Sequence, residues 1–363
     1  MKVTQMKVTP LSVPMDHPFQ SPMGGMNAIN NPVIVQLYTD EGAESFGICT
    51  TSNNMRVKSL KACLDDLAPV VIGQDVARIN EAWQKLWAAT GGMGHTGYGI
   101  MALSAIDNAL WVLRAKMLNL PLSTLLGGYR EKVPAYCSYL LWRNWTIDQL
   151  QKDAADVVKM GFKAMKMRMG TYPFDVEVQR YKAVREVVGK DIDIMVDCNW
   201  AYTTPQAIRL GRMLDGLGLF WFEDPLTSDD AEQIAQVSAA LDTPIVVGET
   251  WSTKYGFRTL FEKKASDIVM IDVQKVGGVT EWMRVAAMAS AFNIPVASHL
   301  FDDISCHLVG AIPNGIWCEY MPWYDKIYMN PPQVKDGFIE IPKVPGIGWE
   351  IDPQAFKKFE FKG

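Results

Sequence analysis

The sequence of 363 residues lacks the features of several protein classes. No apolar run is long enough to cross a bilayer and the N-terminal residues have no signal-like core, so we expect neither a membrane span nor secretion. The net charge is −5 and no basic cluster is present, which argues against nucleic acid and anionic membranes as partners. The six cysteines show no CxxC spacing, so we expect most of them to be reduced and packed in a cytoplasmic protein.

The sequence contains the spacing of a dinucleotide-binding motif, but not the strand and the acidic residue that accompany it. Residues 92–97 spell GxGxxG, the spacing with which a strand–turn–helix unit holds a pyrophosphate. Here the motif follows the helical stretch INEAWQKLWAAT instead of a strand, and no acidic residue stands about 20 residues further on. We therefore do not expect a nicotinamide or flavin cofactor.

The second half of the chain repeats a short apolar run that ends in a polar residue, at intervals of about 20 to 30 residues. The runs are rich in β-branched and aromatic residues, which is typical of buried strands, and helical patterns lie between most of them. The closing residues are Asp197, Glu223, Glu249, Asp272, His299 and Glu319.

Two earlier segments, VPAYCSY and GFKAMKMRMG, continue the repeat, and alternation places Lys166 and Arg168 on one face of the second. Eight strand–helix units predict an α/β fold, a (β/α)8-type barrel. Such a barrel carries its chemistry at the carboxyl ends of its strands.

Three of the closing residues, Asp197, Glu223 and Glu249, are carboxylates on consecutive predicted strands. Without basic residues at the same depth they would repel one another unless a cation lay between them. A helix cap or a solvated loop is the better explanation for any one of them alone, but the set favours a hard divalent ion. Oxygen ligands without Cys or His favour Mg2+ or Mn2+ over Zn2+, and three protein ligands leave room for water and a bidentate substrate.

Candidate proton carriers lie on both sides of this predicted metal site. Lys166 and Arg168 precede it, and Asp272 and His299 follow it on adjacent strands. A carboxylate beside an imidazole fixes the ring tautomer and raises its basicity, whereas a lone His on an apolar run is more often a packed core residue. Glu319 is either a protonated acid that donates a hydrogen bond to an oxyanion or a capping carboxylate.

The segments DCNWAY, FWFEDP, VVGET, IDVQKVGGVT and ASH, preceded by GFKAMKMRMG, resemble the enolase superfamily, and within it the mandelate racemase-like subgroup of acid-sugar dehydratases and racemases. The resemblance covers nearly the whole chain. It implies Mg2+ bound by Asp197, Glu223 and Glu249, an acid/base pair of His299 and Asp272, and enolate stabilisation by Glu319. It also implies a homo-oligomer and a small carboxylate substrate, either a sugar acid or a 2-hydroxy acid.

The second predicted strand departs from the subgroup, which usually has Lys-x-Lys where this chain has Lys166-Met167-Arg168. A guanidinium keeps its proton at ordinary pH, so Arg168 is a poor base and a good partner for a carboxylate. Dehydration of a sugar acid, with His299 as acid and base, is therefore the expected reaction. Lys166 with a lowered pKa is the alternative base on the opposite face. Racemisation, epimerisation or cycloisomerisation, and a barrel that binds metal and ligand without turnover, are the alternative functions.

The chain is expected to divide into an N-terminal α+β capping domain (1–130), the barrel (131–325) and a C-terminal segment (326–363) that returns to the capping domain. NPVIVQLYTDEGAESFGICT predicts two strands around residues 40–42.

Five residues are substrate-binding candidates. The stretch 15–31 contains Gly, Pro and Asn, which indicates a mobile surface loop. By the resemblance it covers the barrel mouth, with His17 and Phe19 against the substrate. Asn199, Trp200 and Trp251 follow predicted metal ligands closely and are expected to line the site.

Overall fold

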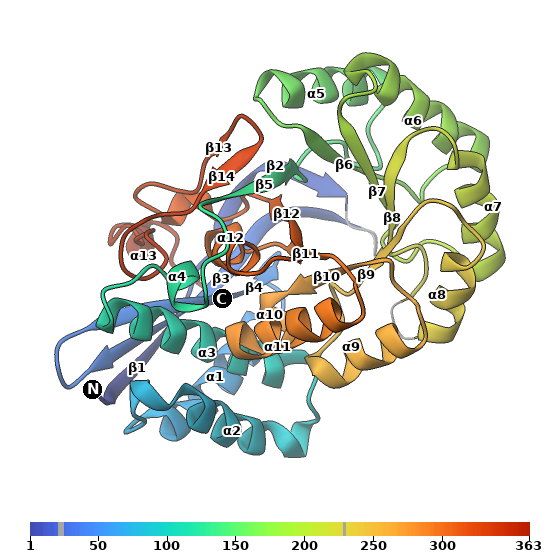
Figure 1. Ribbon diagram of the computed structural model, residues 1–363. Coiled ribbons are helices and arrows are strands. Elements are labelled where there is room, and N and C mark those ends of the chain that lie inside the picture. The colour runs from blue at the N-terminus through green and yellow to red at the C-terminus, as the bar shows by residue number, and fades with distance from the viewer. Residues whose placement is uncertain (21–24, 228–229) are drawn as a thin grey trace.

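Two sheets organise the computed structural model of this protein, which describes residues 1–20, 25–227 and 230–363. An antiparallel sheet with its helices forms the N-terminal capping domain, and a ten-stranded sheet contains the barrel (Figure 1). Among the described residues, no helix combines the length and the apolar character needed to cross a bilayer.

The capping domain is built around one long strand, β3 (Met26–Thr39). It pairs antiparallel with β1 (Val3–Pro10), β2 (Val13–Gln20) and β4 (Glu44–Ser52), and the turn between β3 and β4 lies where the sequence predicted it. The helical elements that follow are α1 (Val57–Val71), η1 (Val76–Arg78), α2 (Ile79–Thr90), η2 (Gly91–Met93), α3 (Gly97–Met117) and α4 (Leu122–Leu125). The apolar faces of α1, α2 and α3, with Val76 of η1 and the valines of β3, form one buried cluster, which holds helices and sheet together.

The stretch 15–31 is mostly strand, so the expectation of a loop is wrong for its described part. β2 and the start of β3 pair from Val13 to Gln20, while residues 21–24 of the expected loop lie outside the described residues. The reason lies in alternate positions: Val13, Met15 and Phe19 are buried beneath exposed neighbours, which is the period of a half-buried strand. The Gly and Pro content hid this alternation.

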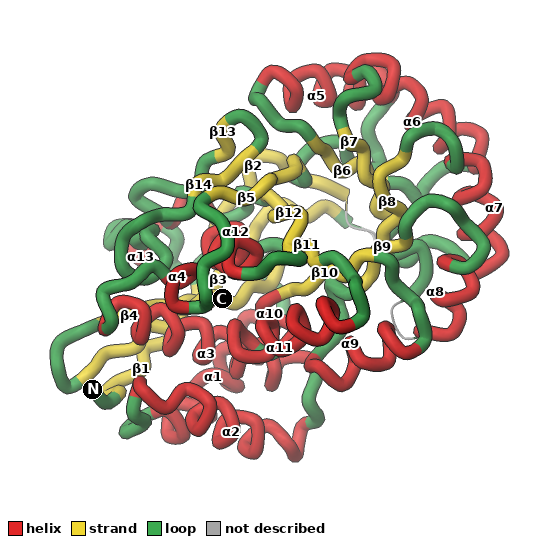
Figure 2. The backbone as a smooth tube through the Cα atoms, in the orientation of Figure 1, coloured by secondary structure: helices red, strands yellow, loops and turns green. Residues whose placement is uncertain are grey.

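Eight parallel strands run in chain order and the last pairs with the first, which closes the predicted barrel (Figure 2). They are β5 (Lys132–Cys137), β6 (Ala164–Arg168), β7 (Asp193–Asp197), β8 (Leu219–Glu223), β9 (Ile245–Val247), β10 (Ile268–Asp272), β11 (Val296–His299) and β12 (Gly315–Tyr320). The outer helices are α5 (Ile147–Lys159), α6 (Phe174–Val188), α7 (Thr204–Leu214), α8 (Ala231–Ser238), α9 (Thr253–Glu262), α10 (Val273–Val276), α11 (Gly278–Ala291) and α12 (Asp302–Ala311).

The eighth strand is not followed by a barrel helix. The described chain after β12 contains only the short elements η3 (Asp325–Ile327), β13 (Val334–Lys335), β14 (Phe338–Glu340) and α13 (Ala355–Lys358). β14 pairs antiparallel with β5 of the barrel. Lys326 Nζ donates to the carbonyl of Pro14 at 2.8 Å, and the amide of Ser12 donates to the carbonyl of Phe359 at 2.7 Å. The C-terminal segment thus contacts both the barrel and the capping sheet.

Strand register brings the polar ends of neighbouring strands to one level. Asp197 on β7 is opposite Glu223 on β8, and Asp272 on β10 is opposite His299 on β11. Inside the barrel, a layer of buried side chains that includes Tyr136, Met195 and Trp221 forms a separate apolar cluster. Because this layer fills the interior, the polar side chains lie on a packed floor and face the carboxyl end of the barrel.

Candidate active site

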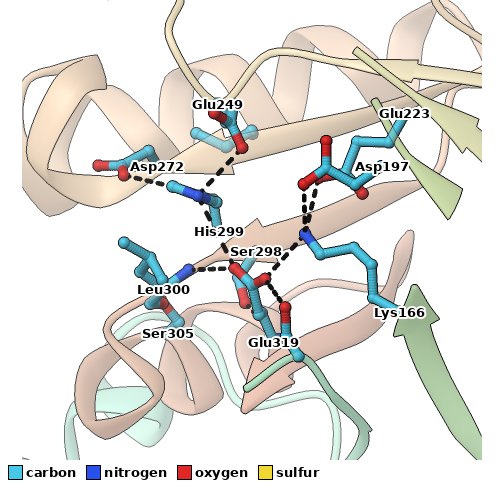
Figure 3. A network of polar contacts seen from close by, with 12 residues as sticks. Lys166, Asp197, Glu223, Glu249, Asp272, Ser298, His299, Leu300, Ser305 and Glu319 are labelled. Carbon is cyan, nitrogen blue, oxygen red and sulfur yellow. Dashed lines mark hydrogen bonds and ion pairs between the residues drawn. The ribbon is translucent and has the colours of Figure 1, made fainter. Parts of the chain in front are cut away.

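His299 and Asp272 form a buried hydrogen-bonded pair, with 2.6 Å between His299 Nδ1 and Asp272 Oδ2 (Figure 3). The other oxygen of Asp272 accepts hydrogen bonds from the backbone amides of Gln274 and Lys275, at 2.7 and 2.9 Å, and caps α10. With both oxygens engaged, the carboxylate is fixed and the ring keeps its Nδ1 proton. Nε2 of His299 is then the nitrogen that exchanges protons.

The Nε2 side of His299 faces two further carboxylates. Glu249 Oε2 lies 3.1 Å from Nε2 and Glu319 Oε2 lies 3.9 Å from it. Burial lowers the pKa of His299, but Glu249, Glu319 and the hydrogen bond to Asp272 outweigh it and raise the pKa to about 10. The ring in this arrangement is an imidazolium, ready to donate a proton.

Lys166 lies on the other side of the same group of carboxylates. Its ammonium is 2.7 Å from Glu223 Oε1, 2.9 Å from Glu319 Oε1 and 4.0 Å from Asp197 Oδ2. Burial lowers the pKa of Lys166, but these three carboxylates outweigh it and the pKa is raised above its ordinary value. The lowered pKa that would make Lys166 a base is therefore not found in this arrangement, where the contacts raise it.

The three predicted metal ligands lie at the carboxyl ends of β7, β8 and β9, all of them buried. Glu249 stands two residues beyond β9, because the chain turns at Gly248, where φ is +134°. Only glycine fits at this turn, since a Cβ would lie 3.2 Å from the carbonyl carbon of Met270 and closer still to its oxygen. The premise that these carboxylates have no basic partners is wrong. Glu223 contacts Lys166 and Glu249 contacts His299, at the distances given above.

The donor set fits a hard divalent cation. Asp197, Glu223 and Glu249 offer only carboxylate oxygens, and burial together with neighbouring carboxylates raises the pKa of Glu223 to about 8 even with Lys166 beside it. Among the described residues no three His, Cys, Asp or Glu side chains stand in the arrangement of a metal site. The ligands would exchange their contacts with Lys166 and His299 for the ion.

Glu319 is held by donors on every side. Ser138 Oγ donates to its Oε1 at 2.5 Å. The amide of Leu300 donates to its Oε2 at 2.8 Å (Figure 3). Burial raises the pKa of Glu319, but Lys166 and His299 outweigh it and lower the pKa to about 2. The expectation of a protonated acid is therefore not met in this arrangement, where Glu319 is an ionised acceptor.

Arg168 turns toward the loop after β5. Its guanidinium donates to the carbonyl of Ser138 and, at 2.8 Å, to Ser138 Oγ, and it stacks 4.2 Å from the ring centre of Trp142. Its Nε lies 3.6 Å from Asp197 Oδ2. Arg168 thus joins Asp197 to Ser138, which agrees with the expected role of a carboxylate partner.

Among the predicted substrate-binding residues, Asn199 and Trp200 are engaged by neighbouring carboxylates. The Asn199 side chain donates to Asp197 Oδ2 at 2.9 Å, and the Trp200 indole donates to Asp224 Oδ2 at 2.9 Å. Trp251 is half-buried after β9, and its indole nitrogen has no hydrogen-bond partner within the described residues.

His17 and Phe19 lie on strand β2 of the capping domain. Phe19 is buried and stacks 3.8 Å from the ring centre of Trp142, the same ring on which Arg168 lies. His17 is exposed, with its ring centre 5.4 Å from that of Tyr139. Phe19 therefore connects the cap to the site through Trp142, whereas His17 lies at the edge.

Sequence reasoning missed three residues of the site: Ser138, Asp224 and Arg143. Ser138 directly follows the first barrel strand, and strand position alone could have found it. Asp224 follows Glu223 directly. It is fully buried, burial raises its pKa, and its Oδ1 has no hydrogen-bond partner in the described part of the chain. Arg143 lies in the loop after β5, where no pattern in the letters distinguishes it from a surface arginine.

These features describe a barrel whose carboxyl end holds a group of buried carboxylates between Lys166 and His299. Comparison with protein families agrees: residues 149–355 match the model described as "Enolase C-terminal domain-like", and residues 3–127 match "Mandelate racemase / muconate lactonizing enzyme, N-terminal domain". The chain belongs to the enolase superfamily, in its mandelate racemase-like subgroup.

Relatives in this family include both dehydratases and isomerases. An arabinonate dehydratase from Saccharolobus solfataricus is 33% identical over 82% of this chain and 82% of its own length. A 3,6-anhydro-alpha-L-galactonate cycloisomerase from Streptomyces coelicolor is 31% identical over 88% of this chain and 89% of its own. The crystal structure of L-talarate dehydratase from Polaromonas sp. JS666, complexed with Mg and L-glucarate, has a TM-score of 0.94, with 27% identity over 99% of this chain and 98% of that one.

Proposed function

We propose that this protein is a Mg2+-dependent enzyme that removes the proton α to the carboxylate of a sugar acid and expels the β-hydroxyl as water. The product is then a 2-keto-3-deoxy acid. The observation that carries the proposal is the His299–Asp272 pair, held beside three carboxylates at or just after the carboxyl ends of consecutive strands. The dehydratase relative supports the reaction class.

Asp197, Glu223 and Glu249 would hold the metal ion, Mg2+ or Mn2+. When bound, this ion acts as a Lewis acid that stabilises negative charge on the substrate carboxylate. The buried floor of the barrel keeps bulk water from below the site, which strengthens each of these electrostatic interactions.

His299 makes the proton transfers in this proposal. With Glu249 engaged by the metal ion instead of by Nε2, the ring would lose the neighbouring charge that holds its extra proton. Nε2 of the neutral ring then takes the α-proton, while Asp272 keeps the other nitrogen protonated. The same nitrogen then returns that proton to the β-hydroxyl, which leaves as water if the elimination is syn. The electron pair of the broken C–H bond forms the double bond of an enol, and the enol tautomerises to the ketone. Ser138 and Arg168 orient Glu319 and Asp197 around the developing charge.

A racemase, epimerase or cycloisomerase is the second candidate, and one observation favours it. Lys166 and His299 reach Glu319 from two sides, at 2.9 and 3.9 Å, as two proton carriers on opposite faces of a substrate would. Against it, the carboxylates around Lys166 keep its proton on, so Lys166 serves better as a charge than as a base. A homo-oligomer stays a prediction from the family resemblance.

A library of sugar acids with Mg2+, analysed for 2-keto-3-deoxy acids, tests the proposal. We expect one or a few acids to give the product, with no product after His299→Asn. Products that are stereoisomers or lactone isomers of the acid would establish the second candidate. Binding of acids without any turnover would contradict both and indicate a binding protein.

A further inference from the structure

Arg143 is a buried cation at the barrel mouth that the reaction above does not use. It lies in the loop between β5 and α5 and is 5% exposed, comparable to Glu249 at 6% and His299 at 9%. Its guanidinium donates to the side-chain oxygen of Asn199, whose amide group bonds Asp197 at 2.9 Å. One carboxamide therefore separates Arg143 from a predicted metal ligand.

Arg143 has no carboxylate partner within 4.0 Å in the described part of the chain, unlike Lys166 and Arg168 beside it. Lys166 contacts three carboxylates and Arg168 contacts Asp197. Arg143 has only a neutral amide, and its Nε makes no hydrogen bond to any described residue. A buried guanidinium with no carboxylate in direct contact is costly to the fold, so Arg143 is suited to an anion that arrives with the substrate.

A neighbouring arginine shows what a structural arginine looks like in this region. Arg180 is equally buried, and its Nε lies 3.4 Å from Glu177 Oε2. Its guanidinium also donates to the carbonyls of Trp145 and, at 2.9 Å, Arg143. Arg180 is thus neutralised and fixes the backbone of the loop, which leaves the Arg143 side chain free of that task.

The Arg143 side chain lies beside the loop after β6 and reaches Asn199 in the loop after β7. A Cβ placed on Gly170 would come within 3.6 Å of Arg143 Nη1 and 2.5 Å of the Cβ of Ala201, at a φ of +105° that favours glycine. The guanidinium therefore packs over the backbone after β6 and points toward the loop after β7, where Asn199 lies. This is the C-terminal face of the barrel, the face on which the reacting carboxylate would bind.

We propose that Arg143 binds a second carboxylate, at the far end of the substrate, and that the preferred substrates are therefore dicarboxylic sugar acids. This inference rests on the proposed function for the chemistry at the other end of the molecule. A guanidinium binds a carboxylate through two parallel hydrogen bonds, and Arg143 has donors free for them. A sugar acid with an uncharged terminal hydroxymethyl group would leave this buried charge unpaired.

The experiment compares a diacid with the monoacid of the same stereochemistry, galactarate with galactonate and glucarate with gluconate. With Mg2+ present, we expect kcat/KM in the wild type to favour the diacid of the preferred pair by at least about 10-fold. Arg143→Gln should lower the diacid-to-monoacid ratio by about 10²-fold, the scale of a charged hydrogen-bonded pair. Arg143→Lys keeps the positive charge but cannot make two parallel hydrogen bonds, so its diacid-to-monoacid ratio should lie between those of the wild type and Arg143→Gln. Thermal melting monitors the folding of each variant.

Asn199→Ala is the matched control. It removes the link between Arg143 and Asp197, so it should lower kcat/KM for both acids by similar factors and leave their ratio within a few-fold. If Arg143→Gln behaves in the same way, or if the wild type prefers monoacids, the inference is wrong and Arg143 is a structural residue.

Calorimetric binding of the same four acids separates this inference from the proposed function. If no acid is turned over, the dehydratase assignment fails. Tighter binding of diacids than of monoacids, lost in Arg143→Gln, would still support the anion site. Equal binding of diacids and monoacids by both proteins would refute the site.

Discussion

Replacing Asp272 by Asn tests the link between strand register and proton transfer. One oxygen of Asp272 accepts from the amides of Gln274 and Lys275, and the other is 2.6 Å from His299 Nδ1. An asparagine has one acceptor oxygen and one donor group. Because two backbone N–H groups need the oxygen, the NH2 group must face His299.

This arrangement forces the wrong tautomer on His299. An amide NH2 at Nδ1 requires that nitrogen to be an acceptor, so the proton of the neutral ring moves to Nε2 and the base is lost. Loss of general acid–base catalysis costs about 10²- to 10⁴-fold in rate. We expect kcat to fall by that factor while substrate Kd and the melting temperature change little, because the cap of α10 is retained.

The assay is the rate of 2-keto acid formation under saturating substrate, with substrate Kd measured separately by calorimetry. Asp272→Ser provides the control: its hydroxyl can cap α10 but is too short to hold the imidazole, so a similar loss of kcat is expected. A near-normal kcat in Asp272→Asn would refute the reasoning, and so would a loss that merely parallels unfolding.

Three further outcomes follow from the structure. EDTA should abolish activity and Mg2+ restore it, and Glu223→Gln should weaken Mg2+ binding in a calorimetric titration; full activity in metal-free protein would exclude the metal site. Gly278→Ala should destabilise the fold by about 1–3 kcal/mol in urea unfolding, because its Cβ would lie 2.5–2.9 Å from three atoms of the Asp107 side chain at a φ of +79°. Burial raises the pKa of Asp107 from 3.8 to about 7, so between pH 4 and 7 the folded protein binds a proton that the unfolded chain does not. The free energy of unfolding should therefore fall as the pH rises through this range. Asp107→Asn should flatten that part of the pH profile, and an unchanged slope would show that Asp107 is not its source.

The barrel could be predicted because each buried parallel strand is a short apolar run in the sequence. The polar residue at the end of each run marks where the strand ends. Asp197, Glu223, Asp272 and His299 end their strands where the repeat placed them. Glu249 shows the limit, since the turn at Gly248 places it beyond β9.

Side-chain pairing was the part that spacing could not show. Lys166 and Glu223 are 57 residues apart, and nothing in either segment indicates that they meet at 2.7 Å. That contact contradicts the assumption of unpaired carboxylates and helps to keep Lys166 protonated. Arg143 was missed for the same reason. It stands out only because no carboxylate among the described residues contacts it, which the sequence does not show.

The strand pairing of β2 was hidden by composition. Prolines at positions 14 and 18 and glycines further on indicated a loop, whereas the burial of Val13, Met15 and Phe19 follows the period of a strand. Pairing with β3, a long-range contact, decides between these two readings of the same residues.

The most direct test of the central claim is the position of deuterium after reaction in D2O. If His299 serves one face of the substrate and water is lost, the product is a 2-keto-3-deoxy acid with deuterium at C3, seen by NMR. Recovered starting acid that is inverted and deuterated at C2 would contradict this account, because Lys166 would then act as a second base.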